Sequence, residues 1–153
     1  MVARSSRDSW DEAAGVAAQA QAISDRAVKL AQTDEKAWAD ALAVLREAEA
    51  GSDGDARRDF RLEQKLERAA AVPLEIAALG ADAATLATLV GERGDGTYRG
   101  DASAAAALAA GGARAAAHLV RVNLGMGAED PRLARAHASE QAANDAAARM
   151  LEH

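Results

Sequence analysis

The sequence predicts an all-α protein, an antiparallel bundle of about five to six helices. Alanine, the strongest helix former, contributes 45 of the 153 residues. Leucine, glutamate, arginine, glutamine and lysine, which also favour helices, supply most of the rest. Valine and isoleucine are scattered. No segment alternates apolar and polar residues with the period of two that a half-buried strand requires.

Length and composition limit what this chain can be. Its length predicts one domain, residues 1–150, with a single core. The absence of cysteine excludes disulfides, thiolate metal sites and a cysteine nucleophile. A net charge of -6 without a basic tract disfavours nucleic acid as a partner. We expect no membrane association, because no apolar run near 18 residues is free of charge. The N-terminus lacks a signal-peptide pattern, which predicts a cytoplasmic protein.

The N-terminal third of the chain predicts one or two helices. The first is expected to begin at a capping box formed by Ser9 and Glu12. The segment Gln32-Thr33-Asp34 is either a break or a polar turn of one longer helix. A further helical run carries residues 38–45 and ends before residues 51–55, which are rich in glycine and aspartate.

The next helix is expected from about Asp55 towards Leu79. Pro73 lies inside it and predicts a kink, because proline removes a backbone donor and clashes with the preceding turn. Gly80 permits a break before residues 81–90 continue as helix. Residues 91–100 hold four glycines and are expected to form the longest loop.

Two more helices complete the prediction. Asp101 is interpreted as the N-cap of an alanine-rich helix over residues 102–124. Gly111-Gly112 in its middle costs helix stability, about 1 kcal/mol each relative to alanine, and so predicts that another helix passes very close. Pro131 favours the first position of the last helix, which is expected to end near Met150.

The core of such a bundle is thin, because alanine faces bury little area each. Oligomerisation compensates for a thin core, and we expect a homodimer. The last residues, Leu151-Glu152-His153, are typical of a vector-derived scar and the start of a purification tag. That leaves His118 and His137 as the native histidines. Neither belongs to a zinc-ligand pattern, so no metal site is expected.

Three segments together resemble the cyclodeaminase/cyclohydrolase family. Residues 70–77 (AAVPLEIA) match the pattern A-x-V-P-L-E-(I/V)-A, and Val120-Arg121-Val122-Asn123-Leu124 matches V-R-I-N-L. Between them, Gly100-Asp101 opens an alanine-rich helix as the N-A-x-S-D segment of the family does. The family includes the cyclodeaminase half of formiminotransferase-cyclodeaminase and bacterial methenyltetrahydrofolate cyclohydrolases. The resemblance extends over about residues 1–150.

The resemblance implies a helical, usually dimeric protein whose substrate is a tetrahydrofolate derivative, with no bound cofactor. The cyclodeaminases of the family turn 5-formiminotetrahydrofolate into the 5,10-methenyl form and ammonia. Its cyclohydrolases interconvert the methenyl form and 10-formyltetrahydrofolate.

The chain also departs from the pattern of the family. Members usually begin with several tens more residues that include a Pro-Gly-Gly-Gly-Ser loop. In the N-A-x-S-D segment, Thr97 and Gly100 replace asparagine and serine, and Asp101 alone is retained.

Asp101 and His118 are the candidate catalytic residues. Both family reactions pass through a cationic centre that a carboxylate stabilises, and both need a proton donor or acceptor. Asp101 supplies the carboxylate, although the alternative of a plain helix cap explains it somewhat better. His118 is the native histidine inside a helix that matches the family. The alternative for His118 is an ordinary packing residue.

The candidate substrate-binding residues are Arg99, Arg121, Asn123 and Glu75. The glutamate tail of folate carries carboxylates, which arginines bind well. Asn123 can bond a pterin edge or cap a neighbouring turn. Glu75 follows Pro73, where a kink would free a carbonyl.

These residues predict an enzyme that acts on a one-carbon tetrahydrofolate, in the 5,10-methenyl or 5-formimino form, or on a related cyclic amidine. Two alternatives remain open at this point. The chain is either a degenerate family member that serves as a non-catalytic helical dimer, or a relative recruited to another cyclisation reaction. The expected partners are a folate-like small molecule and a second copy of the chain.

Overall fold

A computed structural model describes residues 2–6, 10–50, 56–124 and 129–151. The described residues form α1 (Val2–Ser5), α2 (Ala13–Ala50), α3 (Ala56–Arg93), a short 3-10 helix η1 (Gly96–Tyr98), α4 (Arg99–Leu124) and α5 (Pro131–Leu151), with no strand among them. The all-α prediction is confirmed. Because residues 13–50 and 56–93 are each one continuous helix, four long helices replace the five to six that were expected.

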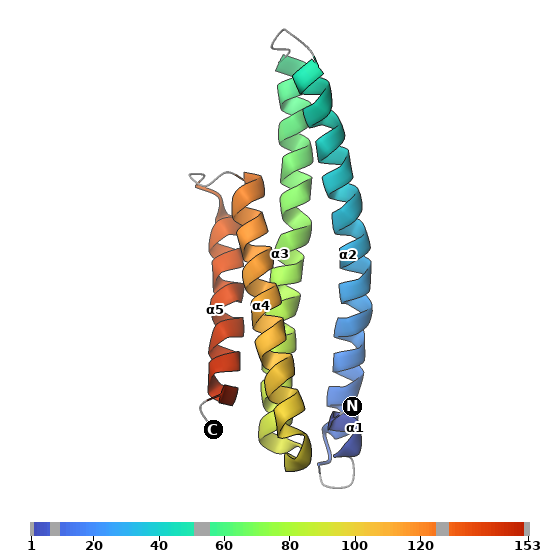
Figure 1. Cartoon of the computed structure of the whole chain (residues 1–153), viewed down its shortest axis with the longest axis vertical. Helices are drawn as coiled ribbons and strands as arrows, with labels where there is room; N and C mark the ends of the chain where they lie inside the picture. The colour runs from blue at the N-terminus through green and yellow to red at the C-terminus, as the bar shows by residue number, and fades with distance from the viewer. Residues whose placement is uncertain (1, 7–9, 51–55, 125–128, 152–153) are drawn as a thin grey trace.

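The helix α3 is the centre of the bundle. The helices α2, α4 and α5 all pack along it, and the α2–α3 hairpin extends beyond the ends of the two shorter helices (Figure 1). Within the described residues, one stretch, Asp59–Arg93, is long and apolar enough to cross a membrane by length and composition alone. In this chain that stretch is the helix against which the others pack.

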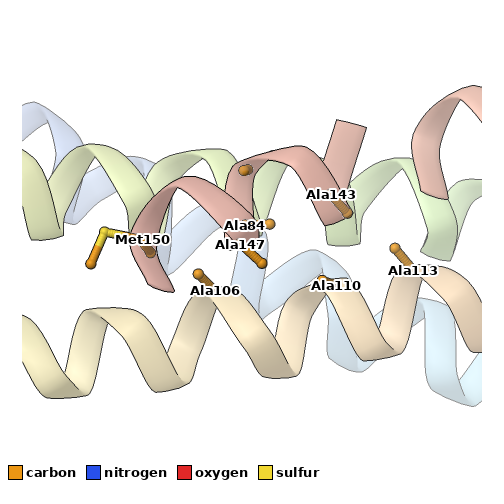
Figure 2. Packing of buried hydrophobic residues seen from close by; sticks show 8 residues of the cluster. Ala84, Ala106, Ala110, Ala113, Ala143, Ala147 and Met150 are labelled. Carbon is orange, nitrogen blue, oxygen red and sulfur yellow. The ribbon is translucent and has the colours of Figure 1, made fainter. Parts of the chain in front are cut away.

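Alanine forms most of the core. Figure 2 shows one cluster of buried side chains in which three helices meet. It contains Ala84 from α3, residues 106, 110 and 113 from α4, and residues 143 and 147 from α5, with Met150 at one end. The buried Thr88 hydroxyl lies 2.9 Å from the carbonyl oxygens of Ala84 and Ala146, so it links α3 to α5. Small side chains bury little area each but allow helices to approach closely.

The breaks expected within the long helices are absent. Gln32-Thr33-Asp34 is a polar turn of the single helix α2, where Thr33 Oγ1 donates to the Lys29 carbonyl at 2.8 Å. Likewise α3 continues through Gly80 without a break, and Pro73 lies inside the continuous helix, where the kink stays a prediction. The reason at Gly80 is packing. A Cβ there would lie 3.0 Å from the Ala113 Cβ and 3.1 Å from the Ala109 carbonyl oxygen, so glycine permits the close crossing of α3 and α4.

The close approach expected at Gly111-Gly112 was therefore assigned to the wrong glycines. Both are exposed on α4, and a Cβ on either would meet nothing within 4 Å. The expected long loop over residues 91–100 is also wrong, because α3 runs to Arg93 and η1 starts at Gly96. The expected capping box at Ser9 lies outside the described residues.

Two helix starts in the second half of the chain are capped by aspartate. Asp95 is the N-cap of η1, because its side chain accepts from Thr97 N at 2.9 Å, whereas Asp101 lies inside the first turn of α4 and is not its N-cap. These hydrogen bonds lower the pKa of Asp95. At the other start, Asp130 Oδ1 accepts from Arg132 N at 2.8 Å, and Pro131 takes the first position of α5 as expected.

Candidate functional site

The end of the bundle near α1 holds a pocket with a single carboxylate, which we call the Asp101 pocket. Its volume is about 430 Å³. Four helices contribute to it. The lining residues are Ala3 and Arg4 of α1, Ala17, Ala20, Gln21 and Ile23 of α2, Ala83, Leu86, Ala87 and Val90 of α3, and Asp101, Ala102 and Ala105 of α4. The walls are therefore apolar, with Arg4, Gln21 and Asp101 as the polar groups.

The N-terminal helix reaches this pocket because two contacts anchor it. Ala3 and Trp10 pack with Leu86, Leu89 and Val90 of α3 in one apolar cluster. The backbone N–H of Asp95 donates to the buried Ser6 hydroxyl at 2.8 Å, which ties the end of α1 to the start of η1. These contacts bring Arg4 to the wall of the pocket that Asp101 also lines.

Asp101 lies in the first turn of α4, where unpaired backbone N–H groups give the helix end a partial positive charge. A carboxylate interacts favourably with that charge. Because Asp101 lies inside the helix and not at its N-cap, and its exposed side chain lines the pocket, it is available to a ligand.

His118 and Arg121 line a different hollow, a groove between α4 and α5 of about 720 Å³. We call it the α4–α5 groove. Arg121 Nη1 lies 3.3 Å from Glu140 Oε2 across it. His118 follows Asp101 by 17 positions on one helix, which places the two about 25 Å apart along its axis. Within one chain, the two candidate catalytic residues therefore do not face the same ligand.

Asn123 and Pro73 form a structural pair. Proline at position 73 has no N–H to donate to the carbonyl of residue 69, four positions earlier. Asn123 Nδ2 donates to that carbonyl, the Ala69 oxygen, at 2.8 Å. The side chain from α4 therefore replaces the missing backbone donor of α3. Of the two roles predicted for Asn123, the structure shows bonding to a neighbouring helix turn.

A smaller hollow of about 290 Å³ adjoins this pair. Trp38, Leu119 and Asn123 line it together with Asp34, whose pKa is raised because burial disfavours its charged form.

The remaining predicted residues are spread over the surface. Glu75 Oε2 accepts from Arg26 Nη2 at 2.9 Å, an exposed ion pair between α3 and α2. Arg99 is exposed at the first position of α4 and lines none of the three hollows described above. Among the described residues, no group of three or more histidine and acidic side chains is arranged to hold a metal ion.

Sequence reasoning missed two groups of residues. Arg4 and Gln21 join Asp101 only through the tertiary fold, so local sequence patterns carry no signal for them. Arg114 is different. It precedes His118 by four residues and Arg121 by seven, the spacing of one helix face, so a search for cationic periodicity would have found it.

Comparison with known proteins assigns the chain to a family. No curated protein sequence matches it. The family model for formiminotransferase-cyclodeaminase matches residues 1–144, which include the Asp101 pocket, the α4 part of the groove and the Pro73–Asn123 pair. The match suggests a function related to folate one-carbon chemistry. The chain belongs to the formiminotransferase-cyclodeaminase family.

Proposed function

We propose that this protein is an enzyme that binds a one-carbon tetrahydrofolate, in the 5,10-methenyl or 5-formimino form, in the Asp101 pocket. One observation carries the proposal. In a chain of this family, a single carboxylate stands in the first turn of α4 at an apolar pocket walled by four helices. An apolar hollow with few polar groups is the usual form of a small-molecule site.

The size, apolar surface and charged groups of the pocket match the ring and the glutamate tail of such a ligand. Its volume of about 430 Å³ lies in the range of known ligand sites, about 300–1,000 Å³. Leu86, Val90 and Ile23 offer apolar surface to a flat heterocyclic ring. Arg4 offers a guanidinium to the carboxylates of a glutamate tail. The ligand itself is the substrate, and the chemistry requires no separate cofactor.

Asp101 has a defined role in the hydrolysis of the methenyl form. The carbon between N5 and N10 belongs to a cationic amidinium, which an adjacent carboxylate stabilises. A water oxygen bonds to this carbon, and the carboxylate accepts a proton from that water. The bond from the carbon to N5 then breaks, N5 takes up a proton, and the 10-formyl product results.

The same carboxylate serves the deaminating reaction. In the formimino form, N10 attacks the one-carbon group and closes the five-membered ring. The terminal nitrogen of the neutral formimino group takes up two protons, one from N10 and one from solvent, its bond to the carbon breaks, and it leaves as ammonia. The methenyl cation that forms is again stabilised by the Asp101 carboxylate. Both reactions therefore need the same charge at the same place.

Calorimetric titration with 5-formyltetrahydrofolate, a stable analogue, tests the binding claim. We expect saturable binding that Asp101→Asn weakens by roughly 10-fold or more, because a hydrogen bond to a charged group contributes about 1.5–3 kcal/mol. Asp82→Asn is the matched control, since Asp82 is an exposed carboxylate of α3 outside the pocket. Equal affinities of the two variants, or no binding by the folded wild type, would contradict the proposal.

We also propose that the protein is a homodimer that pairs through α4. Five exposed residues, Leu108, Gly112, Ala115, Leu119 and Val122, follow one another at spacings of four and three. This is the heptad spacing of helices that pack side by side. Leu108 is 78% exposed, Val122 52% and Leu119 43%, which is unusual for large apolar side chains on one stripe. The stripe also supports the alternative of a non-catalytic dimer.

A further inference from the structure

We infer that the α4–α5 groove is a second ligand site, which binds an elongated polyanion through Arg114, His118 and Arg121. The groove is lined by these three side chains together with Ala107, Ala110, Gly111 and Ala115 of α4 and Glu140, Asn144, Ala147, Ala148 and Leu151 of α5. It is separate from the Asp101 pocket, and the inference does not depend on the folate proposal.

The spacing of the two arginines and the histidine defines the ligand. Arg114, His118 and Arg121 are four and three residues apart, so their α-carbons rise about 6 Å and about 4.5 Å along the helix. Together they span about 10 Å on one side of α4. A single phosphate or carboxylate reaches one or two of them, whereas a chain of oxyanion groups reaches all three.

The acidic residue of the groove does not neutralise both of its arginines. Glu140 is the acidic residue that lines it, and Glu140 is already held by Arg121 at 3.3 Å, with His137 Nδ1 at 4.0 Å. No ion pair joins Arg114 or His118 to another described residue. In a chain of net charge -6 with histidine counted as neutral, the unpaired Arg114 guanidinium in this groove indicates an external anion, to which His118 can also donate a hydrogen bond.

The floor of the groove allows the ligand to approach closely. It consists of alanine and glycine, and a Cβ on Gly111 would meet nothing within 4 Å. The volume of about 720 Å³ is larger than a single inorganic ion requires. Guanidinium groups present paired N–H donors that match the oxygens of phosphate and carboxylate equally well. The shared chemistry is therefore two or more oxyanion groups in a row.

Calorimetric titration of the full chain with tripolyphosphate, and separately with propane-1,2,3-tricarboxylate, tests this inference. We expect one saturable site per chain for at least one probe, with affinity that falls as salt screens the charges. Arg114→Gln and Arg121→Gln should each weaken binding about 10-fold. Arg135→Gln is the matched control, an exposed arginine of α5 outside the groove. Binding of either probe in this pattern supports the site, and the tighter probe identifies phosphate or carboxylate as the preferred group.

Two further variants sharpen the test. Glu140→Gln removes the carboxylate that competes for Arg121, so we expect tighter binding. Asp101→Asn should leave the affinity for these probes unchanged, which distinguishes this site from the Asp101 pocket. The inference is overturned if Arg114→Gln binds like Arg135→Gln, or if neither probe saturates the wild type in the millimolar range. Arg114 is exposed, so thermal melting of its variant should match the wild type and exclude misfolding as the cause.

Discussion

The hydrogen bond from Asn123 to the Ala69 carbonyl explains why two separate motifs occur together in this chain. Pro73 leaves that carbonyl without its helical donor, and Asn123 of α4 supplies one at 2.8 Å. Ala69 is 2% exposed, so water does not readily replace the donor. The VPLE and RVNL segments that carry the family resemblance thus include one structural pair that joins α3 to α4.

A double-mutant cycle tests this pair. Asn123→Ala should lower the free energy of unfolding by about 1–2 kcal/mol, because it leaves a buried carbonyl without a donor. In the Pro73→Ala background the backbone N–H of residue 73 can bond to the Ala69 carbonyl, so the same change should cost far less. Urea denaturation of the four proteins measures the coupling. An equal cost of Asn123→Ala in both backgrounds would show that Pro73 and Asn123 are independent.

The ion pair between Asp130 and Arg132 at the start of α5 should make the stability of the protein depend on pH. Hydrogen bonds and charge attraction from Arg132 lower the pKa of Asp130 from 3.8 to about 2. A carboxyl whose pKa is depressed on folding stabilises the folded state above its unfolded pKa, and the contribution disappears as pH falls through the folded pKa. Asp130→Asn retains the capping oxygen but removes the charge. We expect a lower melting temperature than wild type at pH 7, with the gap closing between about pH 4 and pH 2. A gap of the same size at pH 7 and pH 2 would rule out this origin.

At the scale of the element, the sequence predicts the class of structure well and its interruptions poorly. Alanine content predicts helix, and Pro131 marks the start of α5 correctly. Interruptions were assigned from glycine and proline alone, yet α3 continues through Pro73 and Gly80. At Pro73 the reason is the donor from Asn123, and at Gly80 it is the close crossing with α4. Both reasons are tertiary, so a single helical segment read in isolation does not reveal them.

Two glycine substitutions distinguish packing from propensity. Gly80→Ala should destabilise the protein by about 1–3 kcal/mol, because its Cβ would press on the backbone and Cβ of α4. Gly15→Ala is the matched control. Gly15 is an exposed glycine of α2 whose Cβ would meet nothing within 4 Å, so alanine should stabilise by up to about 1 kcal/mol. Thermal or urea unfolding gives both values. Stabilisation by Gly80→Ala would contradict the close crossing.

At the scale of the whole molecule, α3 serves as the common support for α2, α4 and α5, and this arrangement sets what faces solvent (Figure 1). One side of α4 packs on α3 through alanine and Val120, another borders the groove with α5, and the stripe from Leu108 to Val122 is exposed. The Asp101 pocket is assembled from four helices distant in sequence. Asp101 itself was predictable from the family resemblance, whereas Arg4 and Gln21 become neighbours of it only in the folded chain.

The exposed stripe provides a test of the proposed dimer. Leu108→Glu places a charge where a second α4 would pack, so we expect the molecular mass in light scattering to fall from that of a dimer to that of a monomer. Val28→Glu is the matched control, because Val28 is a 58% exposed apolar side chain of α2, away from the stripe. A wild-type protein that is monomeric at high concentration, or an unchanged dimer of Leu108→Glu, would argue against pairing through this face.

We propose that the Asp101 pocket is the folate site, and a crystal structure of the protein with 5-formyltetrahydrofolate is the decisive test. We predict that the pteridine ring lies against Leu86 and Val90 with its polar edge or one-carbon group beside Asp101, and that the glutamate tail points towards Arg4. Electron density for the ring in the α4–α5 groove beside His118 and Arg121, with the Asp101 pocket free of ligand, would contradict the account.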